Sequence, residues 1–182
     1  MLTPRLETLC TALAQVLIAR KLSMVTAESC TGGLIAASCT QLSGSSAWFE
    51  RGFVTYSNAA KSELLGVAPC LIEAQGAVSE EVAKAMALGA LAHSPAHISV
   101  AVTGIAGPSG GSAAKPVGTV WLAWAWRDLQ QNLHSETMLR QFEGTRSEVR
   151  DATAELALAH LTELVEKLVG KLLETTGKKI PT

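Results

Sequence analysis

The segment "AESCTGG", residues 27–33, places two potential nucleophiles, Ser29 and Cys30, directly before the glycines Gly32 and Gly33. A catalytic serine needs a general base, whereas a thiol near a helix N-terminus is activated but normally also has a histidine partner. The segment lies between an apolar strand-like run and a helical pattern. It therefore resembles a strand-to-helix turn that exposes a nucleophile, although the GxSxG pattern is absent. From these residues alone the nucleophile could be either side chain, and Cys30 could equally be a small packing residue.

Histidine and lysine are the residue types that could supply the base. The four histidines are His93, His97, His134 and His160. Their positions are typical of surface or packing roles, and no pair has the HExxH context of a zinc site. Lys61 follows Tyr56, the only tyrosine, by five residues in "TYSNAAK". A lysine acts as a base only where burial or a neighbouring cation lowers its pKa, and the local pattern predicts a solvated surface lysine instead.

A second glycine-rich segment, "TGIAGPSGG" at residues 103–111, follows the apolar run "HISVAV". Ligands of α/β proteins bind beyond the carboxyl ends of strands, and glycines there let backbone N–H groups face a ligand. Neither glycine segment has the GxxxxGK[ST] or GxGxxG pattern of the common nucleotide-binding loops. Each alone could be a tight turn, but two of them at strand ends indicate a binding site at one edge of a sheet.

Two arginines lie four residues apart in "FEGTRSEVR", residues 142–150. Thr145 and Glu148 have the spacing of a helix capping box, so Arg146 and Arg150 fall on one face of the first turns of a helix. There they could hold a phosphate or a carboxylate. The alternative, which spacing alone favours slightly, is that they form salt bridges with their acidic neighbours Glu143, Glu148 and Asp151.

Around these segments the apolar spacing predicts strands interleaved with helices. Expected strands cover residues 22–28, 47–56, 97–104, 119–126 and 135–142, and expected helices cover about 4–20, 31–42, 58–67, 78–94 and from about 145 into the 170s. Such interleaving predicts an α/β domain with helices on both faces of the sheet. The last two strands are joined by a short polar connection, which predicts a mixed rather than an all-parallel sheet.

Composition narrows the class of protein. The chain has 182 residues, 48% of them hydrophobic and 17% charged, and a formal net charge of −1. This is typical of one globular domain and argues against non-specific nucleic-acid binding, which needs a basic surface. The four cysteines lack zinc-site spacing. No apolar run is long enough to span a membrane and no signal peptide is recognisable, so a cytoplasmic protein is expected.

Several long motifs occur in order along the chain: "TAESCTGGLIA", "GSSAWFERGFVTYSNAAK", "GAVSEEVAKAMA", "VTGIAGPSGGSAAKPVGTV" and "FEGTRSEVR". Together they resemble the CinA C-terminal domain family. The resemblance covers about residues 5–165 and implies a three-layer α/β/α sandwich with a mixed, mostly parallel sheet. It also implies a single domain over residues 1–182, whose tail, residues 175–182, is expected to be loose.

The activity that the resemblance implies is hydrolysis of the carboxamide of nicotinamide mononucleotide, giving nicotinate mononucleotide and ammonia, in pyridine nucleotide salvage. No metal and no cofactor are expected. The family motifs place the nucleophile at Ser29 and its activating partners at Lys61 and Tyr56. For Lys61 this replaces the expectation of a surface residue.

The resemblance also implies a set of substrate-binding residues: Thr31, Gly32, Gly33, Gly44, Ser45, Ser46, Asn58, Thr103, Gly104, Gly107 and Arg146. The backbone N–H groups of residues 31–33 are the expected oxyanion hole, and Arg146 is the expected partner of the 5′-phosphate. A homodimer or higher homo-oligomer is expected. Two alternatives stay open at this point: a catalytically silent paralogue that binds a nucleotide or a partner protein, and a thiol-dependent hydrolase that uses Cys30.

Overall fold

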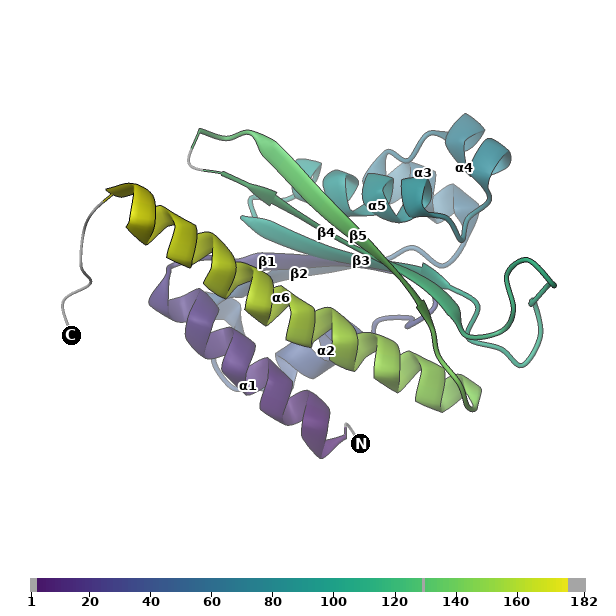
Figure 1. Cartoon of the computed structure of the whole chain (residues 1–182), viewed down its shortest axis with the longest axis horizontal. Helices are drawn as coiled ribbons and strands as arrows, with labels where there is room; N and C mark the ends of the chain where they lie inside the picture. Colours follow the sequence, from purple (N-terminus) through teal and green to yellow (C-terminus); the bar gives the residue numbers. More distant parts are fainter. Residues whose placement is uncertain (1–2, 129, 177–182) are drawn as a thin grey trace.

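The computed structural model describes residues 3–128 and 130–176. They form a five-stranded sheet with helices on both faces (Figure 1). The strand order is β2-β1-β3-β4-β5, with β1 at Met24–Glu28, β2 at Phe49–Val54, β3 at Ile98–Gly104, β4 at Thr119–Arg127 and β5 at Leu133–Gln141. The predicted three-layer architecture is confirmed, and every predicted strand is present with boundaries that differ by a few residues.

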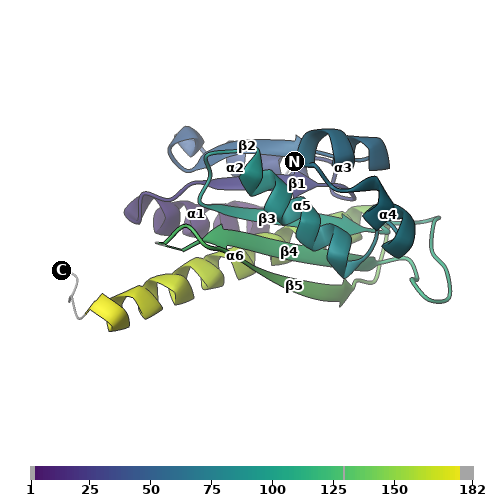
Figure 2. The same ribbon diagram turned by 90° about the horizontal axis from the view of Figure 1, so that it is seen from above.

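Strand direction in the sheet follows from the connections. β1 pairs in parallel with both β2 and β3 after long crossovers that contain helices. β4 pairs antiparallel with β3 and with β5. A connection as short as the one between β4 and β5 can only reverse the chain. β4 alone therefore runs against the other four strands, which gives the mixed, mostly parallel sheet that was expected (Figure 2).

The helices form two layers. On one face of the sheet lie α1 (Pro4–Ala19), α2 (Leu34–Thr40) and α6 (Arg146–Thr176), and on the other lie α3 (Asn58–Leu65), α4 (Pro69–Gln75) and α5 (Glu80–Ala92) (Figure 1). A single 3₁₀ turn, η1, covers Ser45–Ala47. The layer of α1, α2 and α6 is called the leucine layer below, and that of α3, α4 and α5 the alanine layer, after the residues that dominate their packing.

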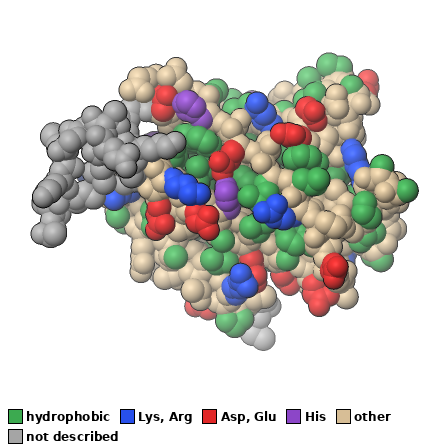
Figure 3. Space-filling model, in the orientation of Figure 1, with side chains coloured by type: hydrophobic (Ala, Val, Ile, Leu, Met, Phe, Trp, Pro, Cys, Tyr) green, Lys and Arg blue, Asp and Glu red, His purple; other side chains and the backbone are tan. Residues whose placement is uncertain are grey.

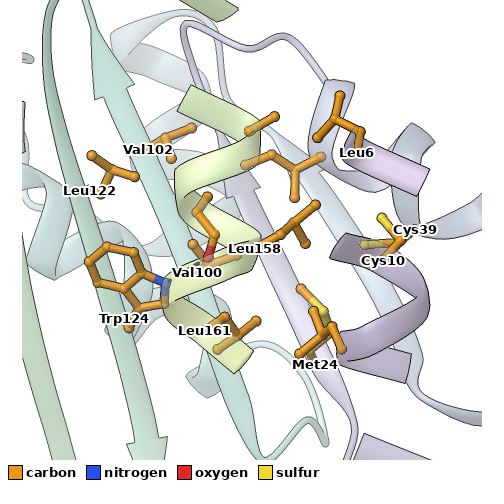
Figure 4. Close-up of a cluster of buried hydrophobic side chains, with 14 of the residues drawn as sticks. Leu6, Cys10, Met24, Cys39, Val100, Val102, Leu122, Trp124, Leu158 and Leu161 are labelled. Atoms are coloured by element: carbon orange, nitrogen blue, oxygen red, sulfur yellow. Dashed lines mark hydrogen bonds between the residues drawn. The ribbon is translucent and has the colours of Figure 1, made fainter. Parts of the chain in front are cut away.

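The leucine layer packs large side chains against the sheet (Figure 4). Leu6 of α1, Leu158 of α6 and Trp124 of β4 are completely or almost completely buried there. The indole Nε1 of Trp124 donates a hydrogen bond of 3.2 Å to the carbonyl oxygen of Ala157, so its one polar atom is satisfied. Burying such side chains is the main source of folding free energy.

The alanine layer packs more closely, because α5 presents small residues to the sheet and to α3. Ala83, Ala87 and Ala90 are fully buried. At Gly89 of α5 an added Cβ would lie 2.1 Å from the carbonyl oxygen of Leu65 in α3, so only glycine lets the two backbones approach this closely. This contact fixes the position of α3 relative to the sheet.

Local signals explain where the helices begin. Ser79 caps α5 by accepting a hydrogen bond of 3.3 Å from the N–H of Val82, as its position predicted. The capping box before α6 is also confirmed, since the N–H of Thr145 donates to Glu148 at 2.7 Å and the N–H of Glu148 donates to Oγ1 of Thr145 at 3.4 Å. These bonds satisfy N–H groups that the helix itself leaves without partners.

Two regions differ from the expectations. The sequence reading missed α4, which has Pro69 in its first turn and Gly76 at its end but is too short to show a helical period. The helix α6 extends through Thr176, and the rest of the tail that was predicted to be loose lies outside the described residues. No helix in the described part of the chain is long and apolar enough to cross a membrane.

Candidate active site

A pocket of about 210 Å³ lies at the edge of the sheet where β1, β2 and β3 end. Its lining includes Ser29, Cys30, Tyr56, Asn58, Lys61, Thr103, Gly104 and Arg146. These residues come from the ends of β1 and β3, the start of α3 and the start of α6. The pocket thus lies beyond the carboxyl ends of parallel strands, where a binding site was expected, and both glycine-rich segments reach it.

Ser29 and Lys61 are in direct contact at the bottom of this pocket. The Nζ of Lys61 donates to Oγ of Ser29 at 3.2 Å and to the carbonyl oxygen of Thr55 at 3.0 Å. The Lys61 side chain is 1% exposed, so the expectation of a solvated lysine that its local sequence pattern gave was wrong. Burial lowers the pKa of Lys61, and the nearby thiol of Cys30 opposes this only in part. A lysine with a lowered pKa can act as a general base.

Cys30 lies beside Ser29 but has the opposite character. Burial raises the pKa of its thiol to about 12, and the charge of Glu28 adds to this effect. Nucleophilic attack needs the thiolate, which is scarce at neutral pH when the pKa is this high. The pocket lining also contains no histidine. The site therefore favours Ser29 over Cys30 as the nucleophile.

Tyr56 and Arg146 meet at the mouth of the pocket. The phenol oxygen of Tyr56, whose residue is 60% exposed, accepts a hydrogen bond of 2.8 Å from Arg146. A second nitrogen of Arg146 donates to the carbonyl oxygen of Gly107 at 2.8 Å. The Tyr56 hydroxyl is thus bonded to Arg146 and not to Ser29 or Lys61. Among the described residues no carboxylate pairs with Arg146, so its charge is available to an anionic ligand.

Arg150 has a different partner from Arg146. Its Nε and one terminal nitrogen both donate to the carbonyl oxygen of Thr31, at 3.2 and 2.7 Å. The salt bridges of these arginines with Glu143, Glu148 and Asp151, which the spacing favoured, are not found among the described residues. Glu148 is instead occupied in the helix cap. The two arginines share a helix face, but only Arg146 reaches the pocket.

The turn after β1 corrects part of the expected oxyanion hole. The N–H of Gly33 donates to the carboxylate of Glu28 at 3.0 Å, and the N–H of Gly32 donates to the carbonyl oxygen of Ser29 at 3.1 Å. Both N–H groups are therefore engaged inside the turn. In the described part of the chain the N–H groups of Cys30 and Thr31 have no oxygen acceptor and face the Cys30 thiol. Thr31 is fully buried and does not line the pocket, so the N–H of Cys30 is the candidate donor beside Ser29.

The sequence reading missed Glu28. Its side chain is completely buried at the start of α2, where its carboxylate fills the helix N-terminus. The available signal was an acidic residue at the end of an apolar strand and directly before a glycine-rich helix start, because a carboxylate there can cap the helix.

Residues of the second glycine segment shape the wall of the pocket. Oγ1 of Thr103 donates to the carbonyl oxygen of Ala77 at 2.8 Å, which fixes the segment before α5. A Cβ at Gly104 would lie 2.8 Å from the carbonyl oxygen of Thr119, so glycine is required there for close packing against β4. Gly107 contributes its carbonyl oxygen to Arg146. Asn58 lines the pocket as expected.

The expected binding segment Gly44, Ser45 and Ser46 is not brought to this pocket. It precedes β2 at the opposite edge of the sheet, where the neighbouring Trp48 accepts a hydrogen bond from the N–H of Met24 at the start of β1. Ser29 follows the far end of β1, one strand length away. Within a single chain this segment therefore does not line the pocket of Ser29, and its expected part in substrate binding stays a prediction.

The site defines a class of protein: an α/β protein in which a serine is paired with a buried lysine in a pocket with an arginine at its mouth. Over the described residues no group of three or more His, Cys, Asp or Glu side chains could hold a metal ion. The sequence matches the CinA C-terminal domain over residues 6–165, and the chain belongs to this family.

Two of the similar proteins share a name. The chain is 52% identical over 159 residues to the nicotinamide-nucleotide amidohydrolase PncC of Pseudomonas putida, a match that covers 87% of this chain and 96% of that one. It is 49% identical over 149 residues to the protein of the same name from Escherichia coli K12, with 81% and 87% covered. Among solved structures, a competence/damage inducible protein from Agrobacterium tumefaciens superposes with a TM-score of 0.83 at 45% identity, covering 90% of this chain and 98% of that one.

Proposed function

We infer that the protein is an amidohydrolase that acts on nicotinamide mononucleotide, releasing ammonia and nicotinate mononucleotide. The observation that carries the inference is the buried contact of 3.2 Å between Nζ of Lys61 and Oγ of Ser29, in a pocket with Arg146 at its mouth. The names of the relatives, which are 49% and 52% identical, support the choice of substrate.

The contact suggests the following steps. Neutral Lys61 takes the proton of the Ser29 hydroxyl while Oγ attacks the carboxamide carbon. The negative charge that develops on the amide oxygen is stabilised by the N–H group of Cys30, a residue that lines the pocket. Protonated Lys61 then gives its proton to the leaving nitrogen, the C–N bond breaks and ammonia departs. Water, deprotonated by Lys61, hydrolyses the ester on Ser29 and restores the hydroxyl.

Arg146 would bind the 5′-phosphate. Its guanidinium has only neutral partners in the structure, the Tyr56 hydroxyl and the Gly107 carbonyl. A phosphate would add a charge-assisted, bidentate contact of the kind for which arginine geometry is suited. Tyr56 then acts by orienting Arg146, and Asn58 lies in the same lining to meet the ribose.

The proposal also covers cofactors, cellular role and oligomeric state. The reaction needs neither a metal nor a cofactor, because the nucleophile, the base and the oxyanion donor all come from the chain. We expect a role in pyridine nucleotide salvage in the cytoplasm, as a homodimer or higher homo-oligomer. The net charge of −1 argues against nucleic acid as a partner. On the face drawn in Figure 3, basic side chains are scattered among acidic ones.

The test is ammonia release from nicotinamide mononucleotide by the purified protein in the presence of a metal chelator. We expect turnover by the wild type and a loss of at least about 10³-fold in Ser29→Ala, whose thermal unfolding should stay close to that of the wild type. Nucleotide binding without any product over a long incubation would overturn the hydrolase and support a binding module. Inactivation by an alkylating reagent that spares Cys30→Ser would support the thiol-dependent alternative.

A further inference from the structure

Glu28 is a buried carboxylate that the proposed reaction does not use directly. One of its oxygens accepts hydrogen bonds from the Thr31 hydroxyl at 2.7 Å and from the N–H groups of Gly33 and Ile35 at 3.0 Å each. The other accepts from the N–H of Ala36 at 2.8 Å. A single side chain therefore satisfies most of the N–H groups at the start of α2 and fixes the inner side of the turn that carries Ser29.

The backbone of Glu28 reaches the base as well as the nucleophile. Its carbonyl oxygen accepts the N–H of Thr55 at 2.8 Å, and the carbonyl oxygen of Thr55 accepts from Nζ of Lys61 at 3.0 Å. Ser29, the next residue along the chain, is tied to β3 by a hydrogen bond of 3.0 Å from its N–H to Val102. Glu28 therefore connects the hydrogen bonds that fix the turn with those that hold Lys61.

Arg150 holds the same turn from α6, which lies in the leucine layer together with α2. Its two hydrogen bonds to the carbonyl oxygen of Thr31 come from α6, and a Cβ at Gly32 would lie 3.8 Å from its guanidinium. A planar guanidinium with two donors on one oxygen fixes direction as well as distance. The peptide that follows Thr31 is therefore fixed on both sides, by Arg150 at its carbonyl oxygen and through the turn that Glu28 caps.

We propose that Glu28 and Arg150 are positioning residues that together hold the turn after β1, so that Oγ of Ser29 stays in contact with Nζ of Lys61 when it attacks the amide of the substrate. The proposal rests on the proposed function for the identity of that substrate. The two residues act only through the turn, since neither lines the pocket. A nucleophile and a base held in the attacking geometry lower the barrier, so a loosened turn should lower kcat while leaving KM close to that of the wild type.

Arg150→Met is the sharper test because Arg150 is only half-buried and its loss should leave a folded protein. We expect kcat for nicotinamide mononucleotide to fall at least about tenfold with KM changed less than about threefold, and Arg150→Lys to recover part of the loss. Arg140→Met is the matched control, because Arg140 is exposed and donates only to the carbonyl of its neighbour Leu139. It should change neither constant.

Glu28→Gln tests the positioning role of Glu28. The amide can keep one acceptor but turns an NH₂ group toward an N–H donor, so the same fall in kcat is expected if the variant folds. Two outcomes overturn the proposal: kcat of folded Arg150→Met within twofold of the wild type, or a rise in KM at constant kcat, which would make Arg150 a binding residue.

If the wild type releases no ammonia, the proposed function fails and the positioning role is decided separately by amide hydrogen exchange. Faster exchange over residues 29–36 in Arg150→Met, but not in Arg140→Met, supports it, and unchanged exchange overturns it.

Discussion

The two helical layers contribute different parts of the site and are packed differently. The alanine layer supplies Lys61 from α3, which Gly89 of α5 lets approach closely. The leucine layer supplies Arg146 and Arg150 from α6, which is held by large buried side chains such as Leu158. The layer with the close backbone contact carries the base, whose pKa depends on burial. The leucine layer, which has the larger core, carries Arg146 and Arg150, whose side chains extend toward the end of the sheet.

The largest expected effect comes from removing the base from the alanine layer. Lys61→Met should lower kcat/KM about 10³-fold, because the serine loses its proton acceptor. In the wild type, activity should fall as the pH falls through the lowered pKa of Lys61, since the protonated amine cannot take the proton. A pH profile of kcat/KM measures this acid limb. A flat profile on the acid side would remove Lys61 from the role of base.

The lowered pKa of Lys61 also predicts how the free energy of unfolding changes with pH. Between the lowered pKa of folded Lys61 and its usual value of 10.5, unfolding takes up a proton. The free energy of unfolding of the wild type should therefore rise with pH through this window, and that of Lys61→Met should lack the rise. Denaturant unfolding at several pH values compares the two proteins.

Some features of the fold and the site could be predicted from the sequence, and others could not. The caps at Ser79 and at Thr145–Glu148 involve residues three apart, so the chain itself predicts them. The burial of Lys61 depends on the approach of α5, which no local pattern encodes, and only the family resemblance pointed to it. Glu28 was missed because its partners become visible only when the turn is folded. The segment at 44–46 lies apart from the pocket because it precedes β2, whereas Ser29 follows β1 at the other end of the parallel strands.

An intermediate effect on activity is expected from replacing Arg146, the arginine of the leucine layer that reaches the pocket. Arg146→Met should lower kcat/KM for nicotinamide mononucleotide by about 10- to 100-fold, mainly through KM, since a charge-assisted contact with phosphate is lost. Nicotinamide riboside, which lacks the phosphate, is the control substrate and should be hydrolysed equally by both proteins. An equal loss on both substrates would place Arg146 in the chemistry instead.

The smallest effects on activity test the packing of the two layers. Gly89→Ala should destabilise the fold by about 1–3 kcal/mol or more and lower kcat several-fold, because the added Cβ pushes α3 and Lys61 away from Ser29. Leu158→Ala should cost about 2–5 kcal/mol in the leucine layer with kcat nearly unchanged. Thermal unfolding and steady-state rates of the two variants are compared. Loss of kcat in Leu158→Ala but not in Gly89→Ala would reverse the roles assigned to the layers.

In the proposed reaction Ser29, activated by Lys61, attacks the amide while Cys30 stays a protonated neighbour. The most direct measurement is ammonia release from nicotinamide mononucleotide by Ser29→Ala and Cys30→Ala, compared side by side with the wild type. We expect Ser29→Ala to lose at least about 10³-fold in kcat and Cys30→Ala to stay within about tenfold of the wild type. Near-normal turnover by Ser29→Ala together with an inactive Cys30→Ala would contradict the proposed reaction.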